Sequence, residues 1–406
     1  MYTETIKLDS VITDIAAGPF GSNLKVSCFV EYGFPIIDGA NLKGFKVTDN
    51  IKKYVTEEKA RSLHRSIAHR NDVVVTISGT LGQIAYIPFD SKFEEYLCSQ
   101  RQFRVTFNTD RVHVPYLVYY FHSREGQHKI LSFANQTGVP ALSQPLKNFR
   151  NIEVNLPDIN TQKRIASVLK SLDNKIELNT KINENLEQQA QAILKSWFVD
   201  FEPFGGKMPD NWNECILDSI CSLIIKGITP KYVDQSDQLV INQKCVRNHQ
   251  VDLSLARCHE PKKVNEKWLQ YGDIVVNSTG TGTLGRAAQV LFIPNNLTVD
   301  SHVTIIRASK KEYLYYLGLW ATSHEHDFEM LQTGSTGQTD LPRERLKQMP
   351  IILPSKDILC KFSEVIKPIA DIKIKNQQEN QHLTVLRNTL LPKLMNGEID
   401  VSKVQI

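Results

Sequence analysis

The sequence predicts an α+β protein with an internal pseudo-twofold repeat: two segments with a mostly antiparallel β-sheet, joined by two long helices that pair as a coiled coil. Three observations predict this fold. Motifs of the first half recur in the second, short β-rich runs bounded by turn residues fill the non-helical segments, and two stretches follow a heptad pattern. At 406 residues, the chain is long enough for two or three domains, each with its own core.

The repeat keeps the same order of motifs in both halves of the chain. The run Asp72–Val75 is matched by Asp273–Val276, and the turn Gly79–Gly82 recurs as Gly282–Gly285. The distance between copies varies along the halves, which indicates loops of different length between fixed elements. The predicted order is an α+β segment at 1–157, a helical segment at 158–200, an α+β segment at 201–354 and a helical segment at 355–406.

Each α+β segment combines short strands with one helical stretch. Strands are expected at 72–79, 83–88 and 102–107 in the first copy, and at 273–280, 289–294 and 302–307 in the second, because these runs are rich in β-branched and aromatic residues. Helical spacing of aromatic residues predicts helices at Val114–Leu131 and Glu312–Leu331. We expect the Gly-Thr-Leu-Gly sequence of each copy to form a tight hairpin turn between two strands.

The helical segments carry a heptad seam in which two asparagines occupy the middle of each copy. Apolar residues at these positions drive two helices together, and a polar residue among them fixes the register. The predicted seam residues are Ile165, Leu169, Leu172, Ile176, Asn179, Asn183 and Leu186 in the first helix, and Ile366, Ile369, Asn376, Asn380, Leu383, Leu390 and Leu394 in the second.

We therefore expect the two helices to pair inside one chain. An antiparallel pair sets Asn179 against Asn380 and Asn183 against Asn376, but a parallel pair also matches asparagine with asparagine, so the pattern leaves the direction open. Two cations, Lys373 and Arg387, interrupt the second seam; we expect their long stems to reach outward. The alternative is that each amphipathic helix packs only on its own α+β segment.

Composition indicates an ordinary globular protein without a membrane span. The net charge is only +4, and the seven cysteines include no Cys-x-x-Cys pair. No uncharged apolar stretch approaches the ~20 residues of a membrane helix, and the N-terminal residues lack the pattern of a secretory signal. We expect a cytoplasmic protein with free thiols and no structural zinc.

No motif predicts a catalytic or cofactor site. The Gly280–Gly285 run fits G-x-G-x-x-G, but a strand rather than a helix is expected after it, so a dinucleotide site is not predicted. No phosphate-binding loop and no two adjacent prolines occur, which excludes the usual ATPase and amino-methyltransferase signatures. His324–His326 offers too few ligands for a metal, and a solvated helix face is expected there.

Polar loop residues at equivalent positions of the two copies are candidates for contacts with DNA. Asn and Gln can pair with adenine, and Arg and Lys with guanine, while hydroxyl groups and lysines suit phosphates. The candidates are Ser22, Asn23, Lys25, Asn41, Lys43, Ser78, Thr80, Arg101 and Gln102 in the first copy, and Lys226, Thr229, Lys231, Gln243, Lys244, Arg247, Ser278, Thr281, Thr283 and Arg286 in the second.

Over nearly its full length the chain resembles the DNA-specificity (S) subunit of type I restriction–modification systems. The similarity lies in Gly18–Leu24, Asp38–Leu42 and the repeated Asp-Val and Gly-Thr-Leu-Gly runs. It continues in Leu156-Pro157 followed by Gln162–Ile165, and in the closing run Leu390–Ile399. Each piece is loose by itself, but together, in order and duplicated, they are specific.

The resemblance implies two target-recognition domains, each reading one half of a split, asymmetric sequence in double-stranded DNA, and two antiparallel helices that act as a spacer. Two modification subunits would bind S-adenosylmethionine and methylate adenine. Restriction subunits would add ATP-driven translocase and nuclease activities, so S-adenosylmethionine, ATP and Mg are expected on the partners and no cofactor on this chain. Two alternatives stay open: an enzyme with its own catalytic centre, and a coiled-coil scaffold that binds proteins. The second is kept open by an α+β segment with one more acidic than basic residue.

Overall fold

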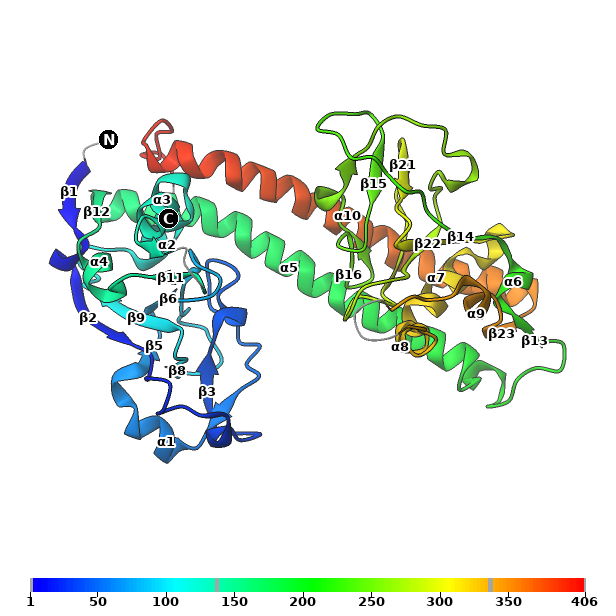
Figure 1. The fold of residues 1–406 in the computed structure, drawn as a ribbon, viewed down its shortest axis with the longest axis horizontal. Helices are drawn as coiled ribbons and strands as arrows, with labels where there is room; N and C mark the ends of the chain where they lie inside the picture. Colours follow the sequence, from blue (N-terminus) through cyan, green and yellow to red (C-terminus); the bar gives the residue numbers. More distant parts are fainter. Residues whose placement is uncertain (1–2, 136–138, 335–338, 405–406) are drawn as a thin grey trace. The chain divides into compact units, whose positions relative to one another are not determined.

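The structure, a computed structural model, describes residues 3–135, 139–334 and 339–404. The chain divides into two compact units, unit 1 (residues 1–176 and 381–406) and unit 2 (177–380). It passes between them inside two helices of 40 residues each, α5 (Ile159–Phe198) and α10 (Lys356–Met395). Each unit therefore contains one α+β domain and a stretch of both helices (Figure 1).

The first α+β domain, residues 3–157 of unit 1, is built on two four-stranded sheets. One has the antiparallel order β2-β9-β6-β7, and the other has the order β4-β3-β8-β5 with β3 and β8 parallel. The strands are β1 (Thr3–Lys7), β2 (Ile12–Ala17), β3 (Phe34–Ile37), β4 (Tyr54–Val55), β5 (Ile67–His69), β6 (Val73–Thr76), β7 (Ile84–Tyr86), β8 (Glu95–Cys98), β9 (Gln102–Phe107), β10 (Ala134–Asn135), β11 (Ala141–Leu142) and β12 (Glu153–Pro157). The helices are α1 (Glu57–Ser62), α2 (Val114–His122), α3 (Arg124–Leu131) and α4 (Pro145–Arg150).

The second α+β domain, residues 201–354 of unit 2, repeats this plan. Its four-stranded sheet has the order β14-β22-β19-β20, and β13 pairs with β23 as β1 pairs with β12. The strands are β13 (Asn213–Ile216), β14 (Cys221–Lys226), β15 (Leu239–Ile241), β16 (Val246–Arg247), β17 (Gln250–Val251), β18 (Arg257–Cys258), β19 (Ile274–Asn277), β20 (Ala287–Gln289), β21 (Leu297–Val299), β22 (Val303–Ala308) and β23 (Pro350–Leu353). The helices are α6 (Leu217–Ile220), α7 (Leu314–Ser323), α8 (Glu325–Met330) and α9 (Arg343–Lys347).

The ends of the long helices complete the cores of the two domains. In unit 1, Ile165 and Leu169 of α5 join the same buried cluster as Val73 and Phe103 of the sheet. In unit 2, Phe362 of α10 and its neighbours join the corresponding cluster. Burying these apolar side chains ties each helix end to a domain by the hydrophobic effect. The expected pairing of the two helices therefore occurs, and the helices also pack on the domains at their ends.

Two details differ from the sequence predictions. Each predicted helix is two shorter helices: α2 and α3 are separated by Ser123, an extended residue whose side chain accepts a hydrogen bond from the Gly126 amide and so starts a new helix. The strand expected at 289–294 ends at Gln289. In the antiparallel pair of β19 and β20, Gln289 lies opposite Ile274, the first residue of β19. Residues after Gln289 therefore lie beyond the end of β19 and do not extend the strand pair.

Asparagines hold the middle of the helix pair in the antiparallel direction. Asn179 donates to Asn380 at 2.9 Å, and Asn376 donates to Asn183 at 2.9 Å. Among the predicted seam residues, Ile165, Leu169, Asn179, Asn183, Ile366 and Leu394 are buried, and Leu172, Ile176, Leu186, Ile369, Asn376, Asn380, Leu383 and Leu390 are half-buried.

The two seam cations do not reach outward, contrary to the expectation from their long stems. Lys373 is paired with Glu187, and Arg387 is paired with Asp173 at 2.7 Å. All four side chains are at most 20% exposed. The acidic partners on α5 explain why cations are tolerated in a partly buried seam, because a buried charge needs a partner.

Replacing Arg387 by methionine is expected to loosen unit 1. The change leaves the Asp173 carboxylate with only the Tyr119 hydroxyl as a side-chain partner, which should cost roughly 1–3 kcal/mol of local stability. Amide hydrogen exchange of peptides from 159–176 in the full chain should become at least several-fold faster. Lys367→Met, which removes an exposed pair with Asp371, serves as the control. Equal exchange in the Arg387→Met variant and the wild type would contradict this assignment.

Candidate nucleic-acid interface

The two Gly-Thr-Leu-Gly runs each connect two strands, as predicted, but in loops longer than the tight turn expected: from Thr76 to Ile84 and from Asn277 to Ala287. One joins β6 to β7 and the other joins β19 to β20, and both strand pairs are antiparallel. Gly82 and Gly285 have φ values of +84° and +85°, a region that favours glycine. A Cβ on Gly82 would lie 2.3 Å from the Gln127 side chain, so the turn packs closely on α3.

The turn of unit 1 borders a cavity of about 690 Å³ with a mixed polar and apolar lining. Four of the predicted contact residues line this cavity: Ser78, Thr80, Arg101 and Gln102. It is also lined by residues that sequence analysis missed, namely Asp38, Lys53, Gln83, Ser99 and Gln100. They lie in separate segments of the chain and share no motif, so only the fold brings them together.

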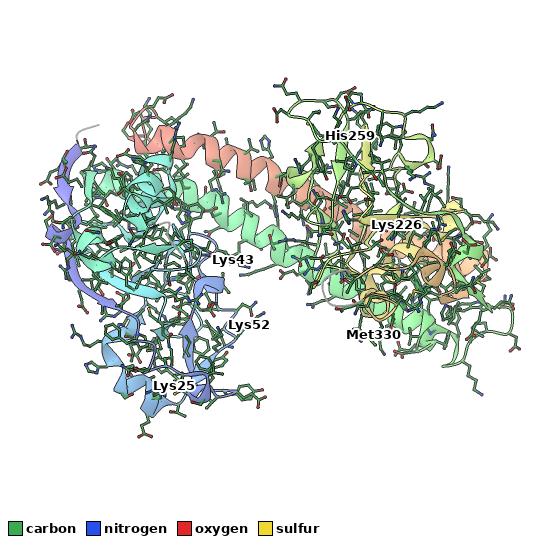
Figure 2. The ribbon with its side chains drawn as sticks, in the orientation of Figure 1. Lys25, Lys43, Lys52, Lys226, His259 and Met330 are labelled. Carbon is green, nitrogen blue, oxygen red and sulfur yellow. The ribbon has the colours of Figure 1, made fainter. Side chains whose placement is uncertain are left out.

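Exposed cations without a partner surround the same domain. Lys25, Lys43 and Arg101 are exposed, and no side-chain hydrogen bond or ion pair joins them to another part of the chain that the structure describes. Ser22 and Asn23 are exposed in the loop after β2. Figure 2 shows Lys25, Lys43 and Lys52 at separate places along the length of this domain. Their spread favours contacts with a polyanion rather than with a single small ion.

Asn41 has a structural role in this fold. It is 4% exposed, its Oδ1 accepts from the Asp38 amide at 3.1 Å, and its Nδ2 donates to the carbonyls of Thr48 and Asn50. A direct contact between Asn41 and a base would break these bonds. The side chain therefore shapes the loop 38–50 instead of being presented for base contact.

In the second domain, more of the candidates are engaged inside the protein. Ser278 is buried against Thr304, and Lys226 is paired with Asp340 at 2.5 Å. Other internal contacts are Lys231 to Glu260, Gln243 to Thr279, Arg286 to the Gly282 carbonyl and Thr283 to the Thr279 carbonyl. Thr229, Lys244, Arg247 and Thr281 are exposed. These four are the residues of this domain that are best placed to contact DNA.

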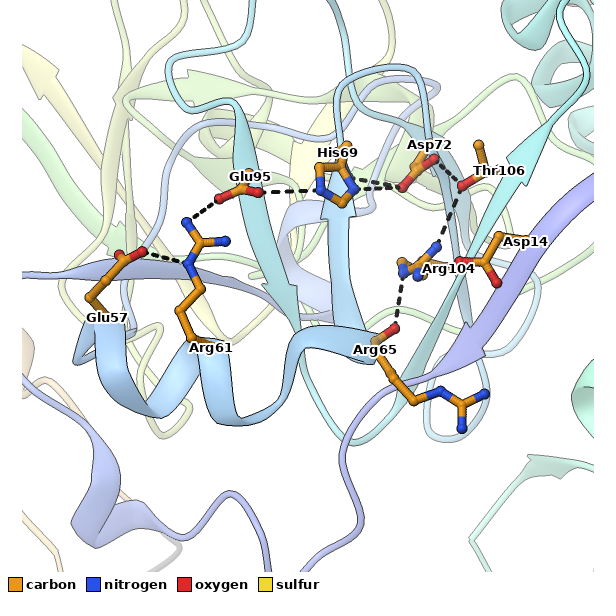
Figure 3. Close-up of polar contacts among 9 residues, drawn as sticks. All are labelled: Asp14, Glu57, Arg61, Arg65, His69, Asp72, Glu95, Arg104 and Thr106. Atoms are coloured by element: carbon orange, nitrogen blue, oxygen red, sulfur yellow. Dashed lines mark hydrogen bonds and ion pairs between the residues drawn. The ribbon is translucent and has the colours of Figure 1, made fainter.

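A polar network under the loops of unit 1 holds its strands together (Figure 3). Arg104 on β9 pairs with Asp14 on β2 at 2.6 Å and donates to the Arg65 carbonyl at 3.0 Å. Asp72, which precedes β6, accepts from Thr106 at 2.6 Å. Burial raises the pKa of the Asp72 carboxyl despite this hydrogen bond. In unit 2, Arg307 and Asp273 make a related pair at 2.7 Å. The repeat had already aligned Asp72 with Asp273, but it gave no sign that their partners would differ, a threonine for Asp72 and an arginine for Asp273.

A second charge cluster, the His249 cluster, joins the turn between β16 and β17 of unit 2 to the helix pair. His249, in the turn between β16 and β17, lies 3.0 Å from Glu187 of α5 and 3.7 Å from Glu325 of α8. Lys373 of α10 also pairs with Glu187. Glu325 accepts from the Ala287 amide at 2.7 Å, so it is not part of the solvated helix face expected at His324–His326. Four elements meet at this cluster.

The charges of this cluster shift the pKa values of its members in opposite directions. Hydrogen bonds to Glu187 and Glu325 outweigh burial and raise the pKa of His249 to about 9. Burial would raise the pKa of Glu187, but His249 and Lys373 outweigh it and lower that pKa to about 2. His249 is therefore a cation at neutral pH and binds two carboxylates.

Neither a metal cluster nor a membrane helix is found in residues 3–135, 139–334 and 339–404. No group of three or more His, Cys, Asp or Glu side chains in these ranges could hold a metal ion. No helix in them is long and apolar enough to cross a membrane.

Comparison with known proteins identifies the family. The family model for the type I restriction modification DNA specificity domain matches residues 21–188 and 209–384. These two matches fall on the two halves of the repeat and cover most of the chain. The chain belongs to this family of DNA-specificity proteins, which confirms the resemblance found in the sequence.

Individual relatives agree with this assignment. The type I restriction enzyme MjaIX specificity subunit of Methanocaldococcus jannaschii is 25% identical, with 87% of this chain and 83% of the relative covered. The HindI specificity subunit of Haemophilus influenzae is 26% identical, with 78% and 84% covered. The S subunit of a type I system from M. genitalium has the same fold, with a TM-score of 0.60 at 15% identity and 97% and 96% coverage. The role of the chain is DNA recognition, and it is not the catalytic component of its system.

The His249 cluster predicts a pH-dependent stability of unit 2. The pKa of His249 rises from 6.5 to about 9 on folding, so its contribution is complete below pH 6.5 and is lost as the pH rises through 9. His249→Gln should lower the free energy of unfolding by about 3 kcal/mol at pH 6, and the difference from wild type should shrink toward pH 9. The Glu187 contribution is complete above pH 4.5 and is lost as the pH falls through 2.

Urea unfolding followed by tryptophan fluorescence measures this difference, because Trp197, Trp212, Trp268 and Trp320 all lie in unit 2. His326→Gln, a change at an exposed histidine, is the control and should have little effect at any pH. A deficit in His249→Gln that stays constant from pH 6 to 9 would show that the histidine acts through packing and not through charge.

Proposed function

We propose that this chain reads a bipartite, asymmetric target in double-stranded DNA, with one half recognised by each α+β domain. The observation that carries the proposal is the repeated sheet order, β2-β9-β6-β7 and β14-β22-β19-β20, with different side chains at its loops. Two copies of one scaffold present two chemically different surfaces within one chain. Such an arrangement suits two different half-sites.

Phosphate contacts and base contacts divide between different residues. Lys25, Lys43 and Lys244 suit phosphates, because they are exposed, flexible point charges. Arg101 and Arg247 are exposed guanidinium groups that can pair with guanine through two hydrogen bonds. Sequence preference therefore depends chiefly on the arginines and the polar residues around them, while the lysines supply affinity.

The partners are two modification subunits and the restriction subunits of the same system, bound at the helix pair. Exposed apolar side chains on the helices support this assignment, since Leu178 is 53% exposed and Ile372 is 47% exposed. The modification subunits bring S-adenosylmethionine and methylate adenine, and the restriction subunits bring ATP and Mg. The chain itself binds no cofactor and works in the cytoplasm, where its DNA substrate lies.

The function is tested by mapping methylation in cells that express this chain with its modification subunit. N6-methyladenine should appear in one bipartite motif and be absent from cells without the chain. The motif gives both half-sites at once. No new methylation despite a stable complex of the two proteins would favour the alternative of a scaffold without DNA specificity.

Separate contributions of lysine and arginine are expected in binding assays with the mapped target. Lys25→Gln and Lys43→Gln should weaken binding to target and unrelated DNA alike, and each should reduce the slope of log K against log salt by about 0.9. Arg101→Gln should cost roughly 1–3 kcal/mol on the target only. Lys7→Gln, an exposed lysine on β1, is the control. Loss of target preference in the lysine variants would contradict this division.

A further inference from the structure

The cavity of unit 1 is large enough to hold a small ligand. Its volume of about 690 Å³ lies in the range of small-molecule sites, roughly 300–1,000 Å³. Part of the lining is apolar and is formed by Leu24, Val26, Phe29 and Ile36; we call it the apolar wall. Most of the other lining residues carry amides, hydroxyls or charges, and we call them the polar wall. A flat ring with hydrogen-bonding edges matches a lining of both kinds.

Gln102 in the polar wall holds a hydrogen-bond donor that has no partner. The side chain is 1% exposed and its Oε1 accepts from the Ser99 hydroxyl, but its Nε2 has no partner among the residues that the structure describes. The cavity therefore presents a donor that an acceptor on a ligand would satisfy.

Gln83 in the same wall is already fixed in position. Its Nε2 donates to the Gly39 carbonyl at 3.0 Å, and its Oε1 accepts from Thr76 at 3.1 Å. The wall around Gln102 is thus ordered before any ligand binds. At the rim, the Arg101 guanidinium lies beside Gly79 and has no partner among the described residues. A cation at the mouth suits a phosphate attached to the ligand.

An exposed aromatic residue stands on the loop that closes the apolar wall. Phe20 is 82% exposed, although a phenyl ring in water is unfavourable. Its loop is fixed to the cavity, because Gly18 donates to the Gln102 carbonyl at 2.7 Å and Gln100 donates to the carbonyls of Gly21 and Leu24. Apolar side chains held in this way insert between base steps in other DNA-binding proteins. In the second domain, the strand register places the exposed residue Thr229 at the position of Phe20.

We propose that this cavity receives one unstacked nucleobase of the half-site read by the first α+β domain. Phe20 fills the place that the base leaves in the stack, Gln102 donates to an acceptor on the base edge, and Arg101 binds the neighbouring phosphate. The inference rests on the proposed function, since it requires that this domain bind DNA. It adds a mode of reading in which one base is recognised outside the duplex.

The test uses the full chain with its modification subunit and the mapped target duplex. The fluorescent base 2-aminopurine is placed at each position of the first half-site in turn, except at the adenine that becomes methylated. One position should brighten several-fold on binding, because the base loses its stacking. A mismatch at that position should tighten binding several-fold, since the pair is already open. A base read inside the duplex would show neither effect.

Variants assign the effect to this cavity. Phe20→Ala should abolish the brightening, and Gln102→Met should weaken binding to the target at least several-fold while the mismatch no longer tightens it. Tyr32→Ala, a change at a 79% exposed aromatic residue that does not line the cavity, should change neither. Brightening that survives Phe20→Ala would overturn the wedge and with it the proposal.

Two further outcomes separate the possible failures. Specific binding and methylation without brightening at any labelled position would overturn the nucleobase site and leave the proposed function intact, whereas loss of specific binding altogether would overturn both. Titration with free AMP distinguishes the source of the base. Tight binding of AMP, with no brightening in DNA, would overturn the extrahelical base and assign the cavity to a free nucleotide.

Discussion

The antiparallel direction of the helix pair is the constraint on which the rest of the structure depends. The asparagines alone cannot set it, because they match in either direction. The ion pairs do set the direction. In the antiparallel pair, Asp173 binds Arg387 and Glu187 binds Lys373. In a parallel pair with the repeat in register, Asp173 would face Ala370 and Glu187 would face Thr384. A parallel arrangement would leave four charges of the seam without partners, at a cost of several kcal/mol for each buried ion.

The same charges also attach the recognition domains to the helices. In unit 1, Arg387 lies 5.0 Å from the Phe45 ring, and Asp173 accepts from Tyr119 at 2.5 Å. In unit 2, Glu187 binds His249 as well as Lys373. Asp173 and Glu187 of α5 therefore each bind a side chain of α10 and a side chain of an α+β domain. A change that breaks the helix pair is transmitted to the domain beside it through shared partners.

The repeat made the fold predictable, whereas the site depends on contacts between distant segments. The heptads, the antiparallel sheets and the hairpin turns all follow from local patterns of residues such as Asp72–Val75 and Gly79–Gly82. The breaks at Ser123 and His324 were missed because aromatic spacing continues across them. Among the candidates, Ser78, Thr80, Arg101 and Gln102 do share a cavity, but the burial of Asn41 and Ser278 depends on neighbours that no local pattern reveals. Direct contacts to bases stay a prediction.

The two α+β domains share one scaffold, and they differ in the side chains of their loops. The pairs Arg104–Asp14 and Arg307–Asp273 hold the strands beneath the loops in both copies, so loop residues can change without loss of the sheet. Lys43 and Arg101 have no side-chain partner among residues 3–135, 139–334 and 339–404, while Lys226 and Lys231 are paired with acids in the second domain. These two ion pairs partly neutralise cations in the second domain, where Lys244 and Arg247 are exposed. Two domains of one fold thus differ in the charges that their loops present, and this difference supports the proposal of a target with two unlike halves.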